Sequence, residues 1–266
     1  MKRSSLVSAN SALDPFNGFA FNGFALSFSG LALSSRLGVW CAKRRRLVEG
    51  EAREDFGVIQ AATLTLLALV IGFTFSMALN RYDQRKLRGR RGNAIGTEYA
   101  RAGLLPAADA AKVRALLLAY LDQRIAFYDT RYGQELSRIN ARTAKLQAEL
   151  WSAVQVPASA QPNAVVALAV EGMNDVLSSQ GYTQAAWWNR IPAVGWGLMA
   201  AIAVCANALV GLGARNAKPE FTLLLILPLV VAIAFFLIAD IDSPRGGFIL
   251  VKPPNLLSLS QSLHSR

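Results

Sequence analysis

Residues 56–79 read FGVIQAATLTLLALVIGFTFSMAL, and this stretch decides the fold of the chain. It holds no charged side chain, and as a helix it would extend about 36 Å, which exceeds the roughly 30 Å hydrocarbon core of a bilayer. Charged residues bound it on both sides, at 53–55 and at 81–86. A buried helix of a soluble protein is seldom apolar all round over such a length. The stretch therefore predicts a transmembrane helix.

Three further segments predict membrane spans. Residues 191–214 and 221–239 are uncharged and strongly apolar, and a short basic connection joins them. The segment 18–40 is a weaker candidate because asparagines and glycines lower its helix propensity. It could instead be a signal peptide, but it has a poor small-residue cleavage pattern, so we interpret it as the first span. The expected fold class is an all-α membrane protein with four transmembrane helices.

Residues 81–190 separate the two pairs of spans and predict a helical insert outside the membrane. After Pro106, apolar residues recur at steps of three and four as far as Val154, as they do in a heptad seam. We expect a long, coiled-coil-like helix over 108–154, which could kink or break at Gly133. It would pair with another helix of the same chain or of a neighbouring one, in a coiled coil or an ordinary bundle.

The remainder of the insert predicts a loop and a returning helix. Two prolines place a loop at 156–162, and a helix over 163–188 follows, with Trp187 and Trp188 suited to a membrane interface. The expected organisation is a disordered tail (1–17), a first transmembrane hairpin (18–80), the insert (81–190), a second transmembrane hairpin (191–240) and a C-terminal tail (241–266).

The composition favours a lipid environment and excludes several classes of function. The formal net charge is +11, but the basic residues cluster beside apolar spans, where they set topology and contact anionic headgroups. No nucleic-acid-binding motif accompanies them, so we expect no nucleic acid partner. Cys41 and Cys205 lie at or within apolar spans and predict packing residues rather than a disulfide. His264 is the single histidine, which excludes a site built on several histidines.

Small residues at a spacing of four mark helix faces that can approach another helix closely. Gln60, Thr63 and Thr74 lie near one side of the second span, where we expect hydrogen bonds between helices, with a permeation path as the alternative. The candidate packing rows are Gly72, Ser76 and Asn80 in the second span, and Gly197, Ala201 and Cys205 together with Ala203, Asn207 and Gly211 in the third.

Polar residues gather where two spans reach the membrane surface. Asn80, Arg81 and Asp83 follow the second span, and Asp240 and Asp242 end the fourth. The simplest interpretation is that Arg81 and Asp83 anchor a span at the headgroups and that the two aspartates form a solvated helix end. Acidic residues oppose the dipole at a helix C-terminus, however. A cation-binding pair or a ring of carboxylates at a pore mouth is therefore the alternative.

The distribution of positive charge does not settle the orientation. Five basic residues lie in 42–55 and six in 81–91, and these two segments face opposite sides of the membrane. The concentration of charge after the second span favours a cytoplasmic insert, which we take as the expectation.

Several local motifs of this sequence are more specific than its apolar spans. They are EDFGVIQAA (54–62), GFTFSMA (72–78), NRYD (80–83), NAIGT (93–97) and DIDSP (240–244). These stretches resemble a bacterial membrane-protein family of unknown function whose members are commonly labelled bestrophin-like. The resemblance covers roughly residues 40–255 and implies the same four-span layout, and its label connects it to bestrophins, which are pentameric anion channels. The sequence shows no acidic run of the calcium-clasp kind, so we do not expect calcium gating.

Two functions follow from these observations. The first is a multi-pass protein of the bacterial inner membrane that assembles among lipids as a homo-oligomer and conducts an ion, with an anion implied by the resemblance. The alternative is a non-conducting scaffold or stress-related protein that binds a partner through 108–154. The sequence contains no Walker loop, GxGxxG, HExxH, CxxC or GxSxG motif. We therefore expect no catalytic residue, cofactor or metal, and an enzyme is the least favoured class.

Overall fold

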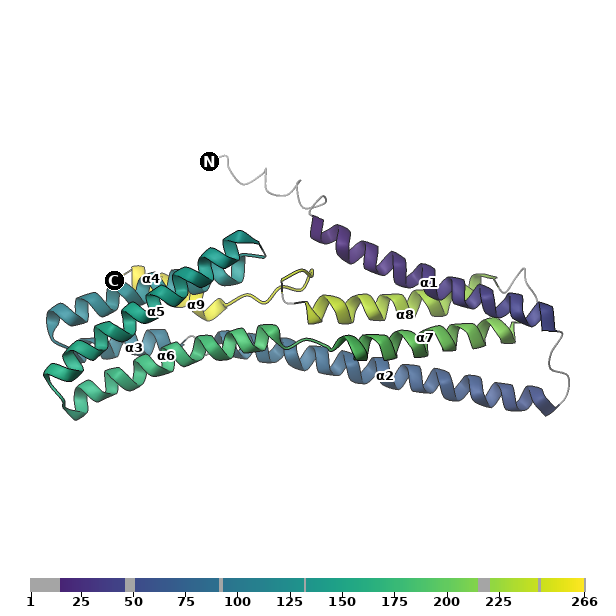
Figure 1. The fold of residues 1–266 in the computed structure, drawn as a ribbon, viewed down its shortest axis with the longest axis horizontal. Helices are drawn as coiled ribbons and strands as arrows, with labels where there is room; N and C mark the ends of the chain where they lie inside the picture. Colours follow the sequence, from purple (N-terminus) through teal and green to yellow (C-terminus); the bar gives the residue numbers. More distant parts are fainter. Residues whose placement is uncertain are drawn as a thin grey trace. The chain divides into compact units, whose positions relative to one another are not determined.

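A computed structural model describes residues 15–45, 51–90, 93–131, 133–214, 221–243 and 245–265, and most of the tail predicted over 1–17 lies outside these ranges. The regular elements in the described ranges are all helices, as predicted (Figure 1). They are α1 (Pro15–Arg45), α2 (Glu51–Arg90), α3 (Asn93–Arg101), the 3-10 helix η2 (Ala102–Leu104), α4 (Ala107–Asp129), α5 (Gln134–Ala160), α6 (Ala164–Trp188), α7 (Ala193–Gly213), α8 (Phe221–Asp242) and α9 (Pro254–His264).

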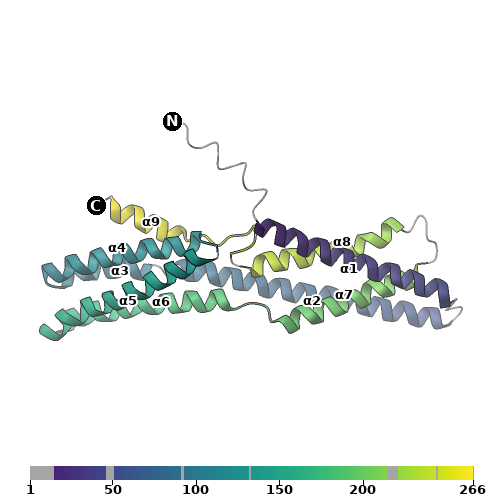
Figure 2. The same ribbon diagram turned by 45° about the horizontal axis from the view of Figure 1, so that its top comes forward.

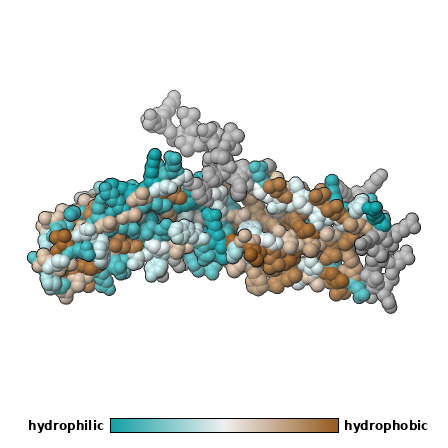
Figure 3. Space-filling model, viewed as in Figure 1, coloured by the Kyte–Doolittle hydropathy of each residue, from teal (hydrophilic) through white to brown (hydrophobic). Residues whose placement is uncertain are grey.

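The chain folds into two compact units. One, which we call the membrane unit, comprises Met1–Asn80 and Arg190–Ile249; the other, the insert unit, comprises Arg81–Asn189 and Leu250–Arg266. Four helical segments of the described chain are long and apolar enough to cross a bilayer. Hydrophobic side chains cover much of the visible face of the membrane unit, whereas hydrophilic ones predominate on the insert unit (Figure 3). The membrane unit thus has the surface expected of a protein solvated by lipid.

Within the membrane unit, α1 packs along α7 and α8 (Figure 1). The closest approach joins Gly38 of α1 to Gly211 of α7, where a Cβ on either residue would collide with the backbone of the other helix. Beside it, the Ser34 hydroxyl donates to the Val204 carbonyl at 2.8 Å, and the Ser35 hydroxyl donates to Asn207 Oδ1 at 3.3 Å. Small residues and interhelical hydrogen bonds hold helices together where lipid supplies little hydrophobic drive.

The insert unit is built on a pair of helices where the sequence predicts a long helix over 108–154 that could kink or break at Gly133. The structure shows the break: α4 ends at Asp129 and α5 begins at Gln134. Gly133 has φ +95° and ψ −160°, a backbone conformation that is essentially restricted to glycine. The two halves of the heptad pattern then pack against each other within one chain. Their buried residues include Val113, Leu117, Tyr120 and Leu121 of α4, and Leu146, Leu150 and Val154 of α5.

Three other expectations about the insert are corrected by the structure. Helix α5 continues through Pro157 to Ala160, since Pro157 lies in the last turn and costs the helix only one hydrogen bond. Trp187 is buried against Phe127 rather than exposed at an interface, whereas Trp188 is 75% exposed. The predicted C-terminal tail contains α9, which packs on α3 and α4. Figure 2 shows α9 as a separate helix at the C-terminal end.

Candidate functional site at the membrane boundary

Both aspartates at the end of α8 are buried and bound by backbone groups. The carboxylate of Asp240 accepts hydrogen bonds from the Phe248 amide at 2.6 Å and from the Ile249 amide at 3.0 Å. The carboxylate of Asp242 accepts one from the Ile191 amide at 3.0 Å. Each side chain retains only 6% exposure. The aspartates therefore fix the chain that enters α7 and the chain that leaves α8.

These contacts correct the interpretation of a solvated helix end. Amide donors compensate the carboxylates locally, which explains how two acids are tolerated where the helix dipole disfavours them. A group of three or more metal-ligating side chains does not occur in the described part of the chain. Gly247 faces Asp240 so closely that a side chain at 247 would collide with the carboxylate. The pore-mouth role of Asp240 and Asp242 stays a prediction.

Within the insert unit, Arg85 of α2 is fully buried and holds the end of α6. Its Nε donates to the Ala186 carbonyl at 3.2 Å and its Nη2 to the Asn189 carbonyl at 2.9 Å. A guanidinium is well placed there, because the last carbonyls of a helix lack partners and carry negative partial charge. From the sequence alone, Arg85 is not distinguished from the other basic residues of 81–91. Its spacing of seven from Ala78, on the buried face of α2, is the signal that could have identified it.

Arg81 lies one turn before Arg85, beside a small polar pocket. The pocket has a volume of about 150 Å³ and is lined by Arg81, Gln84, Ala185, Ala186 and Asn189. Arg81 is half-buried, whereas Asn80 and Asp83 are exposed. The predicted boundary residues thus take different environments, and the structure brings Arg81 toward α6.

The transmembrane part of α2 leaves one broad face uncovered in this chain. Leu67 and Thr74 face inward, whereas Gly72 and Ser76 are exposed, and no atom lies near a Cβ built on Gly72. Exposed residues extend the row of Gly72 and Ser76 in both directions at helical spacing. The row comprises Ala61, Thr65, Ala68, Gly72, Ser76 and Asn80, and we call it the small-residue seam of α2.

The two rows predicted on α7 have different surroundings. Asn207 and Gly211 are buried against α1, and the Asn207 Nδ2 donates to the Ala203 carbonyl at 2.8 Å. Gly197 and Ala201 are exposed, and Gly197 has open space around it. Among the described helices, the row of Ala203, Asn207 and Gly211 therefore contacts another helix of the same chain, and the row of Gly197, Ala201 and Cys205 does not.

The threonines of α2 bond within their own helix. The hydroxyl of Thr63 donates to the Ile59 carbonyl at 2.8 Å, and that of Thr74 donates to the Val70 carbonyl at 2.7 Å. The prediction of interhelical hydrogen bonds is wrong for both hydroxyls within the described chain, because each donates to the carbonyl four residues earlier in its own helix. Cys41 and Cys205 are free thiols, as expected.

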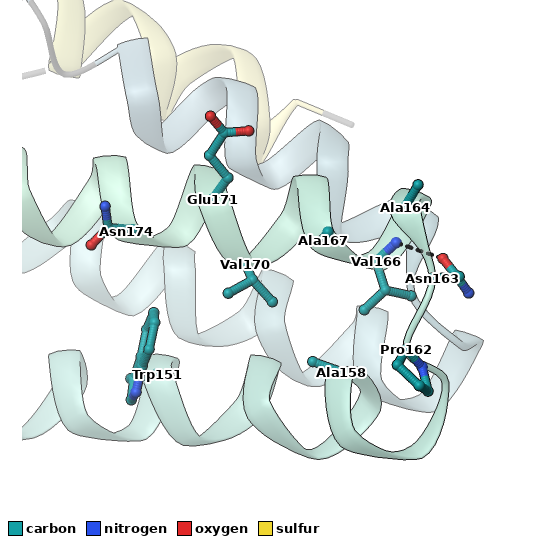
Figure 4. Close-up of a pocket in the computed structure, with 10 residues that line it drawn as sticks. All are labelled: Trp151, Ala158, Pro162, Asn163, Ala164, Val166, Ala167, Val170, Glu171 and Asn174. Carbon is teal, nitrogen blue, oxygen red and sulfur yellow. Dashed lines mark hydrogen bonds between the residues drawn. The ribbon is translucent and has the colours of Figure 1, made fainter.

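The insert unit also carries a groove between α5 and α6, close to the turn that joins them. Its volume is about 720 Å³. Figure 4 shows Trp151 and Val170 facing each other across it, with Pro162 at one end. Asn163 caps α6 by accepting hydrogen bonds from the amides of Val165 and Val166, and this cap fixes the end of the groove.

A family model described as the Bestrophin-like domain matches residues 31–256, which is most of the chain. The chain belongs to the bestrophin-like family. This confirms the resemblance noted from the sequence, and it makes the chain a membrane protein of a channel-like family. No curated protein is significantly similar to this bestrophin-like chain in sequence.

Solved structures share the fold at low sequence identity. The crystal structure of a bacterial bestrophin homologue from Klebsiella pneumoniae is 14% identical, with a TM-score of 0.61, and the match covers 91% of this chain and 95% of that one. A tyrosine-to-alanine variant of the Klebsiella pneumoniae homologue is 13% identical, with a TM-score of 0.62 and coverage of 90% and 96%. The bestrophin-like fold therefore extends over nearly the whole chain.

Proposed function

We propose that this bestrophin-like chain assembles with further copies of itself in the bacterial inner membrane, as a multi-pass protein that conducts ions and favours anions. The observation that carries the proposal is the small-residue seam of α2. A face that only contacts lipid has no need of glycine, serine and asparagine, whereas a face that contacts another helix is enriched in them. The seam has no partner among the described helices of the chain, so α2 of a neighbouring copy is the partner we propose.

The preference for anions is argued from charge. The chain carries a formal charge of +11. Arg81 and Lys86 follow the span of α2, so copies of α2 around a common axis would place basic side chains near its end. Positive charge at a channel entrance concentrates anions and repels cations. The basic residues that follow the span of α2 also bear on orientation. Positive residues are enriched on the cytoplasmic side of membrane proteins, so we propose that the insert unit faces the cytoplasm.

The experiment is reconstitution of the purified full chain into planar bilayers, with a matched pair of variants. Gly72→Leu places a large side chain in the seam, and we expect it to abolish the conductance and to lower the oligomer mass measured by light scattering in detergent. Gly30→Leu, on α1, serves as the control because Gly30 is exposed and equally open but lies outside the seam. It should leave both measurements unchanged.

Two results would overturn separate parts of this proposal. A wild-type protein that gives no current above protein-free bilayers, over several salts and both polarities, is not a channel. A reversal potential that follows the potassium gradient instead of the chloride gradient would reject the anion preference and leave conduction intact.

A second candidate is a non-conducting scaffold that binds a partner through the insert, which the sequence predicts over residues 108–154. The α5–α6 groove favours this candidate, although Trp151 is the one residue of its lining that lies within that range. Trp151 gives this groove an aromatic anchor of the kind that dominates binding energies. If this candidate is correct, one soluble protein should co-purify in a fixed ratio with the full chain, and Trp151→Ala should abolish that association. Co-purification that survives Trp151→Ala would contradict the assignment to the groove.

A further inference from the structure

A carboxyl group is buried in the insert unit without a hydrogen-bond partner among the described residues. Glu98 of α3 has no exposed surface, and neither of its carboxylate oxygens accepts or shares a hydrogen bond with the described part of the chain. Buried polar groups are almost always paired, and an unpaired carboxylate is among the most costly groups to bury. Glu98 therefore requires an explanation.

The carboxyl lies in a space that a glycine provides. A Cβ on Gly172 of α6 would collide with Glu98 Oε2 and would also lie 2.8 Å from Nη1 of Arg101. Helices α3 and α6 pack together here, so Glu98 lies within their contact. The Arg101 guanidinium donates to the Leu168 carbonyl at 3.2 Å and forms no hydrogen bond with Glu98.

Two charged groups act on the Glu98 carboxyl in opposite directions. Arg101, on α3 itself, favours the carboxylate, and Asp175 of α6 disfavours it. From α4, Arg114 contacts α3 but is engaged at Tyr99, where its Nε donates to the backbone carbonyl at 3.3 Å. Helix α9 contributes Leu259, which lies against Gly96, and η2 (Ala102–Leu104) contains no charged residue. His264, at the end of α9, is exposed.

We infer that Glu98 is a proton-binding site that controls the contact between α3 and α6. The neutral acid is accommodated in the space beside Gly172, whereas the carboxylate is left without donors and weakens the contact. Two residues separate the end of α2 at Arg90 from the start of α3 at Asn93, so a looser α3 also loosens the chain that follows the second span. This inference concerns folding and packing and does not depend on whether the protein conducts.

The direction of the pH dependence follows from burial. Burial is the largest effect, and together with Asp175 and against Arg101 it raises the pKa of Glu98 from 4.5 to about 7. The folded chain thus binds this proton more tightly than the unfolded chain. The stabilisation by the proton is complete below about pH 4.5 and is lost as the pH rises through about 7.

The test compares thermal unfolding of the full chain in detergent from about pH 5 to about pH 9. Glu98→Gln mimics the neutral acid, so its unfolding temperature relative to wild type should rise with pH by roughly 5 to 10 °C and level off above about pH 7. Glu171 is an exposed neighbour of Gly172 on α6, and Glu171→Gln is the control. Its unfolding temperature should change with pH in the same way as that of wild type. A constant difference between Glu98→Gln and wild type would overturn the inference.

A second measurement uses the wild-type protein and keeps the test valid if Glu98→Gln does not fold. A membrane-permeant carbodiimide reacts with protonated carboxyl groups in apolar surroundings, and the labelled peptide is identified by mass spectrometry. Labelling of Glu98, measured against the total amount of its peptide, should fall by about tenfold between pH 6 and pH 8. A fall of about a hundredfold over the same interval, as expected of a carboxyl with an ordinary pKa, would show that Glu98 does not bind a proton in this range.

Discussion

At the scale of single residues, the structure assigns the boundary acids to backbone amides. Asp240 accepts two amide hydrogen bonds from the segment that follows α8, and Gly247 makes room for the carboxylate. A buried amide that loses its acceptor costs more than the bond itself is worth, because it has already given up water. The geometry of this segment therefore depends on one side chain.

Asp240→Ala should lower the free energy of unfolding by about 2 to 4 kcal/mol, since it leaves the Phe248 and Ile249 amides without an acceptor. The measurement is thermal or denaturant unfolding of the full chain in detergent. Asp83→Ala removes an exposed aspartate that follows the second span and should change stability by less than about 0.5 kcal/mol. Equal effects of the two substitutions would contradict the structural role of Asp240.

The sequence identifies Asp240 and Asp242 as unusual but misses what they bind. Their donors are amides of Ile191, Phe248 and Ile249, which belong to connections without periodicity, so no sequence pattern pairs them with these two acids. Glu98 escapes detection for a similar reason. An isolated glutamate in a short helix usually lies on the surface, and only the fold shows that Gly172 faces it.

At the scale of elements, apolar spacing predicts the faces of the insert helices better than their lengths. Among the described residues from Val113 to Val154, most members of the heptad pattern are buried, and Leu136 is partly buried. The pattern cannot tell one long helix from two helices that fold back on each other, because both bury the same residues. Gly133 determines that there are two helices, because its positive φ interrupts the helical backbone.

Gly133→Ala should destabilise the protein by roughly 1 to 3 kcal/mol, because its backbone lies in a region almost closed to other residues. Gly181→Ala gives a control of opposite sign. Gly181 lies inside α6 with open space around it, so alanine should stabilise the helix by up to about 1 kcal/mol. Both values come from unfolding of the full chain in detergent. Stabilisation by Gly133→Ala would show that the break between α4 and α5 has another cause.

At the scale of the whole molecule, the insert unit is assembled from two separate parts of the chain. Four membrane spans are readable from apolar length alone, because lipid imposes a strict requirement on each. The sequence does not predict that the chain after α8 packs on the insert unit, because α9 is short and only weakly apolar. Leu256 of α9 nevertheless joins the same buried cluster as Ile95 of α3 and Val113 of α4.

Leu256→Ala should cost about 2 to 4 kcal/mol, the range for a leucine removed from a packed core. The adjacent Leu257 is 41% exposed, so Leu257→Ala should cost less than about 1 kcal/mol. Hydrogen exchange of the α3 and α4 amides is the readout, since it reports the insert unit separately from the spans. Unchanged protection of α3 and α4 in Leu256→Ala would mean that α9 does not support the insert unit.

The late position of α9 in the chain has a consequence for biosynthesis. The ribosome completes α3 to α6 well before it makes α9, and both α7 and α8 are translated in between. The insert unit must therefore wait with Ile95 and Val113 partly uncovered until the second pair of spans has entered the bilayer. Chaperones that shield apolar surface can bind the insert unit during that interval. If the late spans failed to enter the bilayer, α9 would not pack on α3 and α4, and the core of the insert unit would stay incomplete.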